Sequence, residues 1–363
     1  MGADAPAFAL VLSTDQYDAV RLAHAVTREL GPLPWAGCCT AGVFAGAELL
    51  TQGLVVGVFS ARDAAFGVGT GGPVSLDARG AGRAAIAQAI AALPPLGRER
   101  SRTILLLPDA LTGNASEVVR GAAQEAGAGP LWAGGGAGDN LRFVRTAQFA
   151  HGEAFRDHVV AIVLDTRLPV GLGIRHGFSA YGPPVLVTRS AGATAVELEY
   201  ERPFDVYRRT AEARGDHVDE ASFASFAMTH PLGIPQADGD HVIRDPLAIE
   251  PDGSLRCVGD VPDGSLVRVM QANRSELVAA ARQASADARE AVHGPTGGAI
   301  IFDCVSRAKL LGNHMRDELV ALQKGMGVGV AMMGCLTFGE VGAFGAAPPQ
   351  FLNKTTVVLA LPV

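Results

Sequence analysis

Three segments of this chain follow the same plan, and this repetition limits the possible folds more than any other feature. Each segment begins with an apolar run of strand length, at residues 8–12, 103–107 and 299–302. An amphipathic helix is predicted next, over residues 17–30, 116–126 and 309–323. A second apolar and β-branched run closes each segment, at residues 53–59, 158–164 and 355–361. Because one strand and one helix cannot bury an apolar face alone, the segments are expected to pack against each other.

A run of small residues, here called an elbow, lies between the helix and the closing strand of each segment. Elbow 1 covers residues 35–42, elbow 2 covers residues 132–139 and elbow 3 covers residues 333–340. Glycine permits a positive φ and the close approach of a ligand, and successive N–H groups in such a turn can hold an anion. Tight packing of a helix on a strand would also require small residues. A ligand contact and simple packing are therefore both open interpretations of each elbow.

A fourth, degenerate copy is predicted after residue 200. It consists of a helical pattern and three strands, at residues 203–213, 241–249, 254–258 and 266–270. The sequence thus predicts an α/β fold with mixed sheets, in which internally repeated β-α-β-β units form two similar halves. The expected division is an N-terminal domain at 5–170 with two copies, a connecting segment at 171–200, and a C-terminal domain at 201–363 with two copies.

Composition narrows the class of protein. Apolar residues make up 48% of the chain and charged residues 18%, which suits buried cores and argues against disorder. The net charge of −7 argues against a nucleic-acid partner, because domains that bind nucleic acid usually carry a basic face. The sequence has no signal peptide and no apolar run of about 20 residues, so we expect a cytoplasmic protein without a membrane partner. Five cysteines without a Cys-x-x-Cys motif predict free thiols in a reducing compartment.

Several motifs of known catalytic and metal sites are missing from the sequence. It contains no G-x-x-x-x-G-K-[ST], no H-E-x-x-H and no G-x-S-x-G. The sequence therefore predicts no metal site and favours a protein that is not an enzyme. Two alternatives stay open. One is an unrecognised enzyme with Cys304 or Cys335 as nucleophile, which needs a nearby base, and the other is an interaction scaffold with an exposed apolar patch.

The residues of the elbows resemble those of the FIST family, named for F-box and intracellular signal transduction. Residues 37–42, Gly-Cys-Cys-Thr-Ala-Gly, resemble the Gly-Cys-Ser-Thr-Ala-Gly-Glu motif of FIST N-terminal domains. Residues 334–340, followed by residues 351–355, resemble the end of FIST C-terminal domains. Further stretches that look like family landmarks are residues 134–139, 173–177, 229–233 and 303–307. The resemblance covers nearly the whole chain, although Val43 replaces the family's glutamate after elbow 1.

The resemblance implies a sensory domain that binds a small molecule, with an amino acid or related metabolite as the expected ligand. Some bacterial members of the family bind haem and sense nitric oxide, so a haem-binding sensor is the alternative, and the cofactor is otherwise unknown. One animal branch of the family carries an F-box. This chain has no F-box, kinase or cyclase segment, so the signal is expected to pass to a separate protein partner.

Five segments supply the residues expected to contact the ligand. They are Gly37, Cys38, Cys39, Thr40, Gly135, Gly136, Asp139, Arg175, His176, Cys304, Arg307, Gly339 and Glu340. Cys304 and Arg307 follow a predicted strand, at the kind of strand end where ligands bind, and an arginine can hold a carboxylate through two hydrogen bonds. His176 lies between glycines and is the candidate ligand of haem iron. A buried cysteine, a surface arginine and a structural histidine are the competing interpretations of these three positions.

Overall fold

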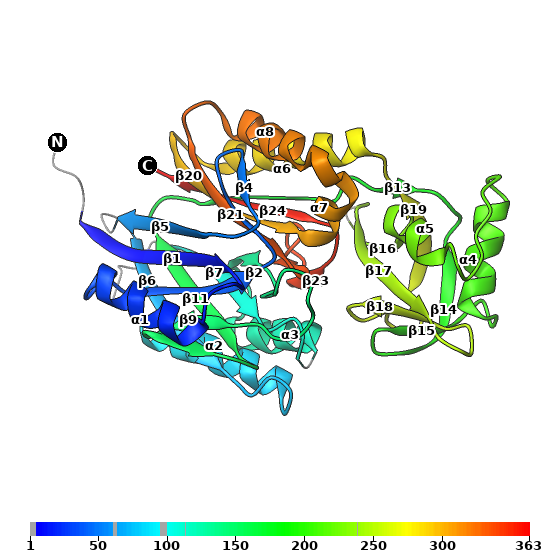
Figure 1. Ribbon diagram of the computed structural model, residues 1–363, viewed down its shortest axis with the longest axis horizontal. Coiled ribbons are helices and arrows are strands. Elements are labelled where there is room, and N and C mark those ends of the chain that lie inside the picture. Colours follow the sequence, from blue (N-terminus) through cyan, green and yellow to red (C-terminus); the bar gives the residue numbers. More distant parts are fainter. Residues whose placement is uncertain (1–4, 61–63, 95–99, 113, 238) are drawn as a thin grey trace.

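The computed structural model describes residues 5–60, 64–94, 100–112, 114–237 and 239–363. Within these residues the chain forms a larger body and a small domain at one end of it (Figure 1). The small domain consists of residues 178–272, and the body contains the other described residues. The sheets of the body mix parallel and antiparallel strands, so the predicted α/β class is confirmed. Among the described residues, no helix is both long enough and apolar enough to span a bilayer.

The three predicted segments have the same strand arrangement. Each has a central strand: β1 (Pro6–Thr14), β7 (Ser101–Pro108) and β20 (Thr296–Cys304). A parallel neighbour follows each helix: β2 (Trp35–Thr40), β8 (Leu131–Gly134) and β21 (Ala331–Thr337). The closing strand lies antiparallel on the other side: β5 (Leu54–Ser60), β11 (Val159–Thr166) and β24 (Thr356–Pro362). The elbows therefore begin as strands; elbows 1 and 3 leave the strand near their ends, whereas elbow 2 leaves it after Gly134.

Helices join the central strand of each unit to its parallel neighbour. They are α1 (Ala19–Leu30), α3 (Ala115–Ala126), and the pair α7 (Val305–Leu311) and α8 (Met315–Met326). The prediction of one continuous helix over residues 309–323 is wrong. The chain breaks at Gly312, whose φ of 52° is a conformation that favours glycine. A short 3-10 turn at Gly312–His314 separates the two helices.

Short hairpins connect the three units to one another. The hairpins are β3 (Val43–Ala45) with β4 (Glu48–Leu50), β9 (Gln148–Ala150) with β10 (Glu153–Phe155), and β22 (Glu340–Gly342) with β23 (Gln350–Leu352). β3 pairs with β21 of the third unit, and β9 pairs with β2 of the first unit. Glu340 in β22 forms a bridge to Gly135 of the second unit. Through these pairings, the hairpins join the three units into one body.

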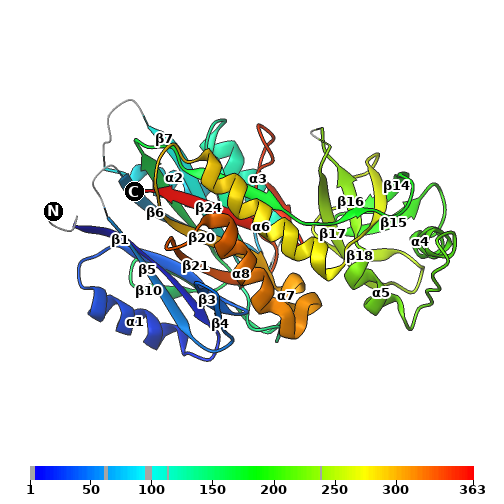
Figure 2. The same ribbon diagram turned by 90° about the horizontal axis from the view of Figure 1, so that it is seen from above.

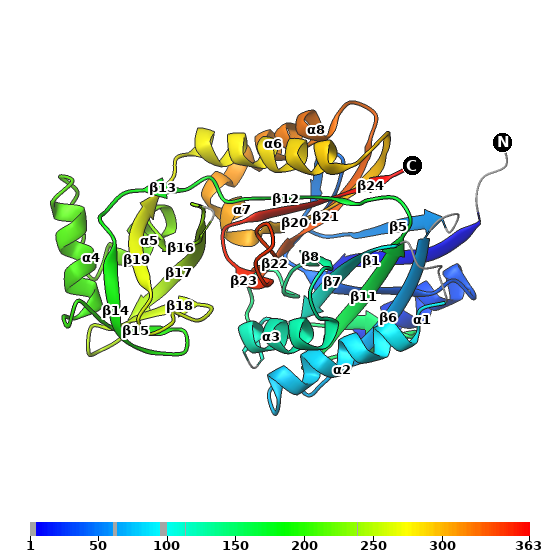
Figure 3. The same ribbon diagram turned by 180° about the vertical axis from the view of Figure 1, so that it is seen from behind.

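Two helices rest directly on glycine-rich outer strands. β6 (Ala64–Gly71) and β12 (Gly171–Arg175) hold the same position in the sheet orders β6-β11-β7-β8 and β12-β24-β20-β21. α2 (Ala78–Ala91) packs on β6, and α6 (Arg274–Ala291) packs on β12 (Figure 3). A Cβ atom on Gly173 would lie 1.9 Å from the carbonyl oxygen of Ala284, and one on Gly69 would lie 2.1 Å from that of Ala85. Glycine is therefore required at both positions for the helix to approach the strand.

The small domain is inserted between β12 and α6 (Figure 2). Its strands are β13 (Ser179–Ala180), β14 (Val185–Ala191), β15 (Thr194–Leu198), β16 (Leu232–Pro235), β17 (His241–Ile249), β18 (Leu255–Val258) and β19 (Leu266–Gln271). Its helices are α4 (Pro203–Glu212) and α5 (Phe223–Thr229). β16 pairs with β19, so the sheet closes on itself around a separate apolar core.

The segment predicted as the fourth copy contains the expected helix and strands but pairs them differently. Every strand pair of the small domain is antiparallel, whereas the other three units each contain a parallel pair. The tight turn at Gly253, with a φ of 86°, returns the chain beside β17, and a parallel pair would need a long crossover instead. The bounds predicted for the two domains and their connecting segment stay a prediction.

Candidate functional site

The structure brings the three elbows into contact through their backbones. The connecting hydrogen bonds run from Gly138 N to Cys39 O (3.0 Å), from Gly136 N to Gly339 O (2.8 Å) and from Ala41 N to Leu336 O (3.0 Å). They join elbow 2 to elbow 1, elbow 2 to elbow 3, and elbow 1 to elbow 3. These N–H groups donate to carbonyl oxygens of the protein itself. They are therefore not available to bind an anion, as the glycine pattern suggested.

The predicted glycines of the elbows are packed against neighbouring backbone. A Cβ atom on Gly37 would lie 1.7 Å from the carbonyl oxygen of Val11. Cβ atoms on Gly135 and Gly136 would lie 3.0 and 2.6 Å from the carbonyl oxygens of Gly339 and Phe338. The space beside these three glycines is filled by protein, so the packing interpretation applies to them.

Cys38, Cys39 and Thr40 lie in β2 and are buried. Burial raises the pKa of the Cys38 thiol well above its usual value and raises the pKa of Cys39 to about 12. The Cys39 sulfur accepts the Ala147 N–H at 2.9 Å, and Thr40 Oγ1 donates to the Gly42 carbonyl at 2.9 Å. These side chains therefore bind neighbouring parts of the body.

Asp139 organises a loop. Its side chain belongs to a residue only 1% exposed, and its carboxylate accepts the N–H groups of Phe143, Val144 and Arg145 at 2.8, 2.6 and 3.0 Å. Asn140, Leu141 and Phe143 in this loop all have positive φ values. The three hydrogen bonds to one carboxylate hold this conformation, so Asp139 shapes the loop instead of facing a ligand.

Glu340 is fully buried beside elbow 3. Its carboxyl accepts Thr337 Oγ1 at 2.8 Å and the Thr355 N–H at 3.1 Å. Burial raises the pKa of this carboxyl to about 8, because an ionised group loses its hydration there. Glu340 therefore connects the start of β24 to elbow 3 through these hydrogen bonds.

The structure does not support Arg307 as a ligand contact. The residue is completely buried, and its guanidinium donates twice to Glu318, at 2.8 and 3.0 Å. The same group donates to the carbonyl oxygens of His176 (2.6 Å), Lys354 (3.1 Å) and Leu277 (2.9 Å). An arginine has five N–H groups, and these five bonds use all of them. Arg307 therefore has no donor left for a ligand carboxylate.

Arg175 and His176 lie at the end of β12, where the chain enters the small domain. Arg175 donates to Asp287 at 2.9 Å. His176 is 5% exposed, with Nε2 2.7 Å from Asp240 Oδ1, while its Nδ1 accepts the Phe178 N–H at 2.8 Å. Both ring nitrogens are thus engaged, so His176 does not fit as an axial ligand of haem iron. It joins β12 to the small domain instead.

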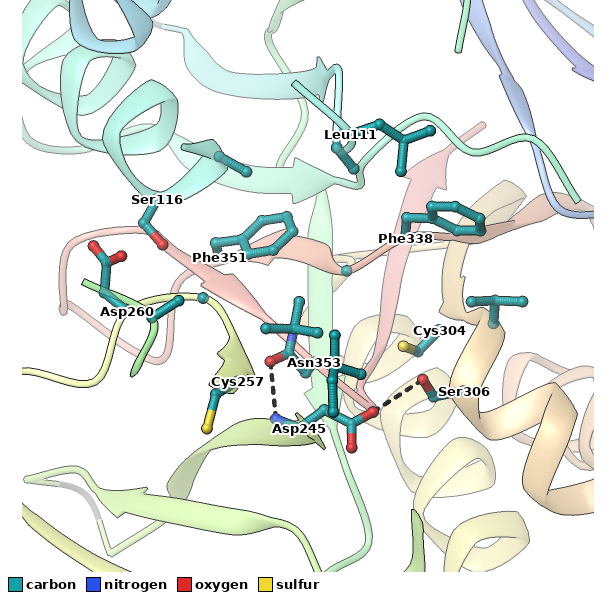
Figure 4. Close-up of a pocket in the computed structure, with 18 of the residues that line it drawn as sticks. Leu111, Ser116, Asp245, Cys257, Asp260, Cys304, Ser306, Phe338, Phe351 and Asn353 are labelled. Carbon is teal, nitrogen blue, oxygen red and sulfur yellow. Dashed lines mark hydrogen bonds between the residues drawn. The ribbon is translucent and has the colours of Figure 1, made fainter. Parts of the chain in front are cut away.

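A cavity of about 510 Å³ lies between the body and the small domain (Figure 4). The body contributes residues 110–111, 114–116, 141, 143, 304–306, 338–339, 351 and 353, and the small domain contributes residues 193, 245, 247 and 256–260. The cavity lies beyond the carboxyl ends of β7 and β20, the strand ends at which α/β folds usually bind ligands. Of the predicted site residues, Cys304 and Gly339 line it.

Asp245 is a buried acid on the small-domain wall of this cavity. It lies in β17, is 3% exposed, and reaches across to the body (Figure 4). Its Oδ2 lies 3.0 Å from Lys354 Nζ and accepts Ser306 Oγ at 3.2 Å. Asn353 Oδ1 accepts the Asp245 N–H at 3.3 Å. Burial raises the pKa of the Asp245 carboxyl, although the ammonium group of Lys354 acts to lower it.

A second carboxylate, Asp260, lies on the same wall of the small domain. It accepts Asn114 Nδ2 at 3.1 Å and Arg120 Nη1 at 2.8 Å. The backbone carbonyl of Asp260 accepts Arg244 Nε at 2.6 Å. Asp245 and Asp260 therefore each tie the small domain to the body beside the cavity.

The rest of the cavity is largely apolar. Phe338 and Phe351 of the body are buried and face it, together with Leu111 (Figure 4). Phe143 packs on Phe338 with 5.1 Å between ring centroids, while remaining 64% exposed. An apolar cavity with a few placed polar groups is the usual composition of a small-molecule site.

The environment of the two candidate nucleophiles opposes thiolate formation. Burial raises the pKa of the Cys304 and Cys335 thiols far above the usual value, and the nearby Glu340 carboxylate acts in the same direction. Reactive cysteines lie instead in electropositive and partly exposed surroundings. Cys335 is moreover fully buried in β21, away from the cavity.

Sequence reasoning missed the polar residues that line the cavity. Asp245 is an acid within the otherwise largely apolar run of β17. A charged residue in a strand of this kind could have identified Asp245 as a candidate site residue. Asn353 lies inside the stretch at 351–355 that resembles the FIST C-terminal domain. Asp260 follows β18 in an irregular segment, and no local pattern distinguishes it from a surface acid.

Comparison with known families gives two matches that together cover nearly all of the chain. The FIST N domain matches residues 7–201, and the FIST C domain matches residues 203–343. The boundary between the matches falls inside the small domain. No curated protein matches the chain.

Proposed function

Because the chain belongs to the FIST family, we propose that it is an intracellular sensory protein that binds a small molecule between its body and its small domain. FIST domains are associated with sensory roles in signal transduction. The observation that carries the proposal is the cavity of about 510 Å³ with walls from both parts of the protein. Its volume lies within the range of about 300–1,000 Å³ that is usual for small-molecule sites. The signal passes to a separate protein partner in the cytoplasm.

The position of the cavity suggests how binding would be transmitted. A ligand that touches both walls favours the arrangement in which the small domain lies close to the body. Cys304, Val305 and Ser306 at the start of α7 line the cavity. Arg307, the next residue of α7, donates hydrogen bonds to the carbonyl oxygens of His176 and Leu277. These two residues lie beside the two connections between the body and the small domain. A movement of α7 would therefore reach both connections.

The ligand is an amino acid or a related small metabolite. Apolar walls with phenylalanine side chains suit an apolar substituent, and Asp245 and Asn353 supply polar contacts at one end. A haem sensor has less support, because both ring nitrogens of His176 are already hydrogen-bonded. An enzyme with a cysteine nucleophile has less support, because burial keeps Cys304 protonated.

A screen of metabolites by thermal unfolding tests this function. A ligand of the native state at a hundredfold excess over its Kd stabilises the fold by about 2.7 kcal/mol, so Tm rises with concentration. Leu111→Trp fills the cavity and should remove this response, whereas Leu168→Trp, at a residue 40% exposed away from the cavity, should keep it. The proposal fails if no compound raises Tm, or if Leu111→Trp responds as the wild type does.

A further inference from the structure

We infer that the ligand carries a positively charged amine on an apolar group, and that Asp245 is the counter-ion of that amine. This inference rests on the proposed function, because it names the ligand class of the same cavity.

Both side-chain contacts to the Asp245 carboxylate use Oδ2, and no described residue forms a hydrogen bond with Oδ1. Lys354 Nζ and Ser306 Oγ both contact Oδ2, at 3.0 and 3.2 Å. Lys354 is completely buried and is not among the described lining residues, so it contacts Asp245 from the protein interior. Burial raises the pKa of Asp245 despite this ammonium group, which means that the ionised carboxylate remains under-solvated. A charged N–H donor from a ligand would restore the missing interaction.

The charges that line the cavity favour a cation over an anion. Within the part of the chain that the structure describes, the acids on the lining are Asp245 and Asp260, and the basic residue is Arg256. The Arg256 side chain is 56% exposed and donates to Glu250 at 2.8 Å, so its charge is directed to the surface. No lysine or histidine of the described residues belongs to the lining. An anionic ligand would meet two carboxylates on the lining, whereas the cations that pair with them, Lys354 and Arg120, do not belong to the described lining.

Ser116 provides an independent sign that the cavity receives a polar ligand. The residue lines the cavity near Asp260 and is 6% exposed (Figure 4). Its hydroxyl has no hydrogen-bond partner among the described residues. A buried polar group without a partner destabilises the protein, and a ligand hydroxyl, amide or bound water would supply the missing hydrogen bond. Phe338 and Phe351 also line the cavity and suit an aromatic or aliphatic substituent.

Three probes of similar shape and different charge test the inference: phenethylamine, phenethyl alcohol and hydrocinnamate. Thermal unfolding and isothermal titration calorimetry would measure their binding at equal concentration. Phenethylamine should bind at least about tenfold more tightly than the alcohol, because a buried charge pair adds to affinity, and hydrocinnamate should not bind.

Substitution of Asp245 assigns the counter-ion. Asp245→Asn keeps the shape of the side chain and should remove the preference for the amine over the alcohol. Because this change leaves Lys354 buried without a partner, Asp245→Asn combined with Lys354→Met provides a second variant without that charge. Asp252→Asn is the matched control, since Asp252 is an exposed acid of the same domain and should leave the preference unchanged.

The outcomes separate this inference from the proposed function. Suppose that the metabolite screen yields a ligand whose binding is lost in Leu111→Trp, while hydrocinnamate binds more tightly than phenethylamine. The cavity would then be confirmed as the binding site, and the inference of a positively charged amine would be overturned. Equal binding of phenethylamine to the wild type and to both Asp245 variants would also overturn it. If neither the probes nor the screen give any binding, the proposed function fails as well.

Discussion

One group of buried charged residues lies between the cavity and the connections to the small domain. Four acids and two basic residues lie there, each at most 3% exposed: Asp245, Asp303, Glu318, Glu340, Arg307 and Lys354. Because these four acids outnumber the two basic residues in a buried environment, ionising every carboxyl would be unfavourable. Burial accordingly raises the pKa of Asp303 well above its usual value, and Asp303 Oδ2 has no hydrogen-bond partner among the described residues.

Glu340 should make the stability of the fold depend on pH. Its pKa is about 8 in the folded protein against 4.5 for an ordinary glutamate, so the folded state binds the extra proton between these values. Raising the pH through this window should lower the free energy of unfolding, by up to about 1.4 kcal/mol per pH unit. Denaturant unfolding at several pH values measures this slope. Glu340→Gln should reduce it, and Glu29→Gln, with a side chain 74% exposed, should not. An unchanged slope in Glu340→Gln would contradict the assignment.

At the scale of elements, the contact between a glycine-rich strand and an alanine-rich helix occurs twice. β6 meets α2 through Gly67, Gly69 and Gly71, and β12 meets α6 through Gly171 and Gly173. In each case the hypothetical Cβ atom lies about 2 Å from a helix carbonyl oxygen, which leaves no room for a methyl group. The stretch at 173–177 that resembles the FIST family therefore contributes to this packing.

Gly173→Ala should destabilise the protein by about 1–3 kcal/mol, because the methyl group forces α6 away from β12. Gly298→Ala is a matched control in β20 of the same sheet. Its Cβ atom would lie 3.5 Å from the Ala331 carbonyl oxygen, an ordinary contact, so the change should stay within about 0.5 kcal/mol. Denaturant unfolding of both variants compares them directly. Equal stability of the two variants would show that α6 can shift freely on β12.

At the scale of the whole molecule, the body and the small domain meet through polar contacts beside the cavity and through apolar contacts, in which Ile243 and Met270 share a core with the body. Asp245 and Asp260 each bridge the two parts, and Gln350 Nε2 donates to Gln236 Oε1 at 2.8 Å. The cavity between them is therefore suited to a ligand that changes how the two parts are held.

A ligand that passes the Leu111→Trp test should slow hydrogen exchange on both sides of the cavity. Protection is expected at the start of α7, in β17, and at the two connections around residues 176–177 and 272–273, because binding favours the closed arrangement. The helix α1 lies away from the cavity and serves as the internal control. Protection confined to the cavity wall would show that binding is not transmitted through Arg307.

The sequence by itself determined the repeated units and their fold class. Apolar runs, helical spacing and small residues are local patterns, and they recur in β1, β7 and β20 with their following helices. The same local patterns predicted that the glycines of the elbows, such as Gly37, lie where a larger side chain would not fit. They did not decide between a ligand and packing, because both require a missing side chain.

Only the tertiary structure decided which polar residues face a cavity. Arg307 and His176 looked suited to a ligand, but their hydrogen-bonding groups are used by partners far away in the sequence. Asp245 lies within a strand, and its position on the cavity depends on how the inserted domain docks on β20 and β23. A local pattern records the shape of each element, whereas the surroundings of a side chain depend on elements that the chain brings together only when it folds.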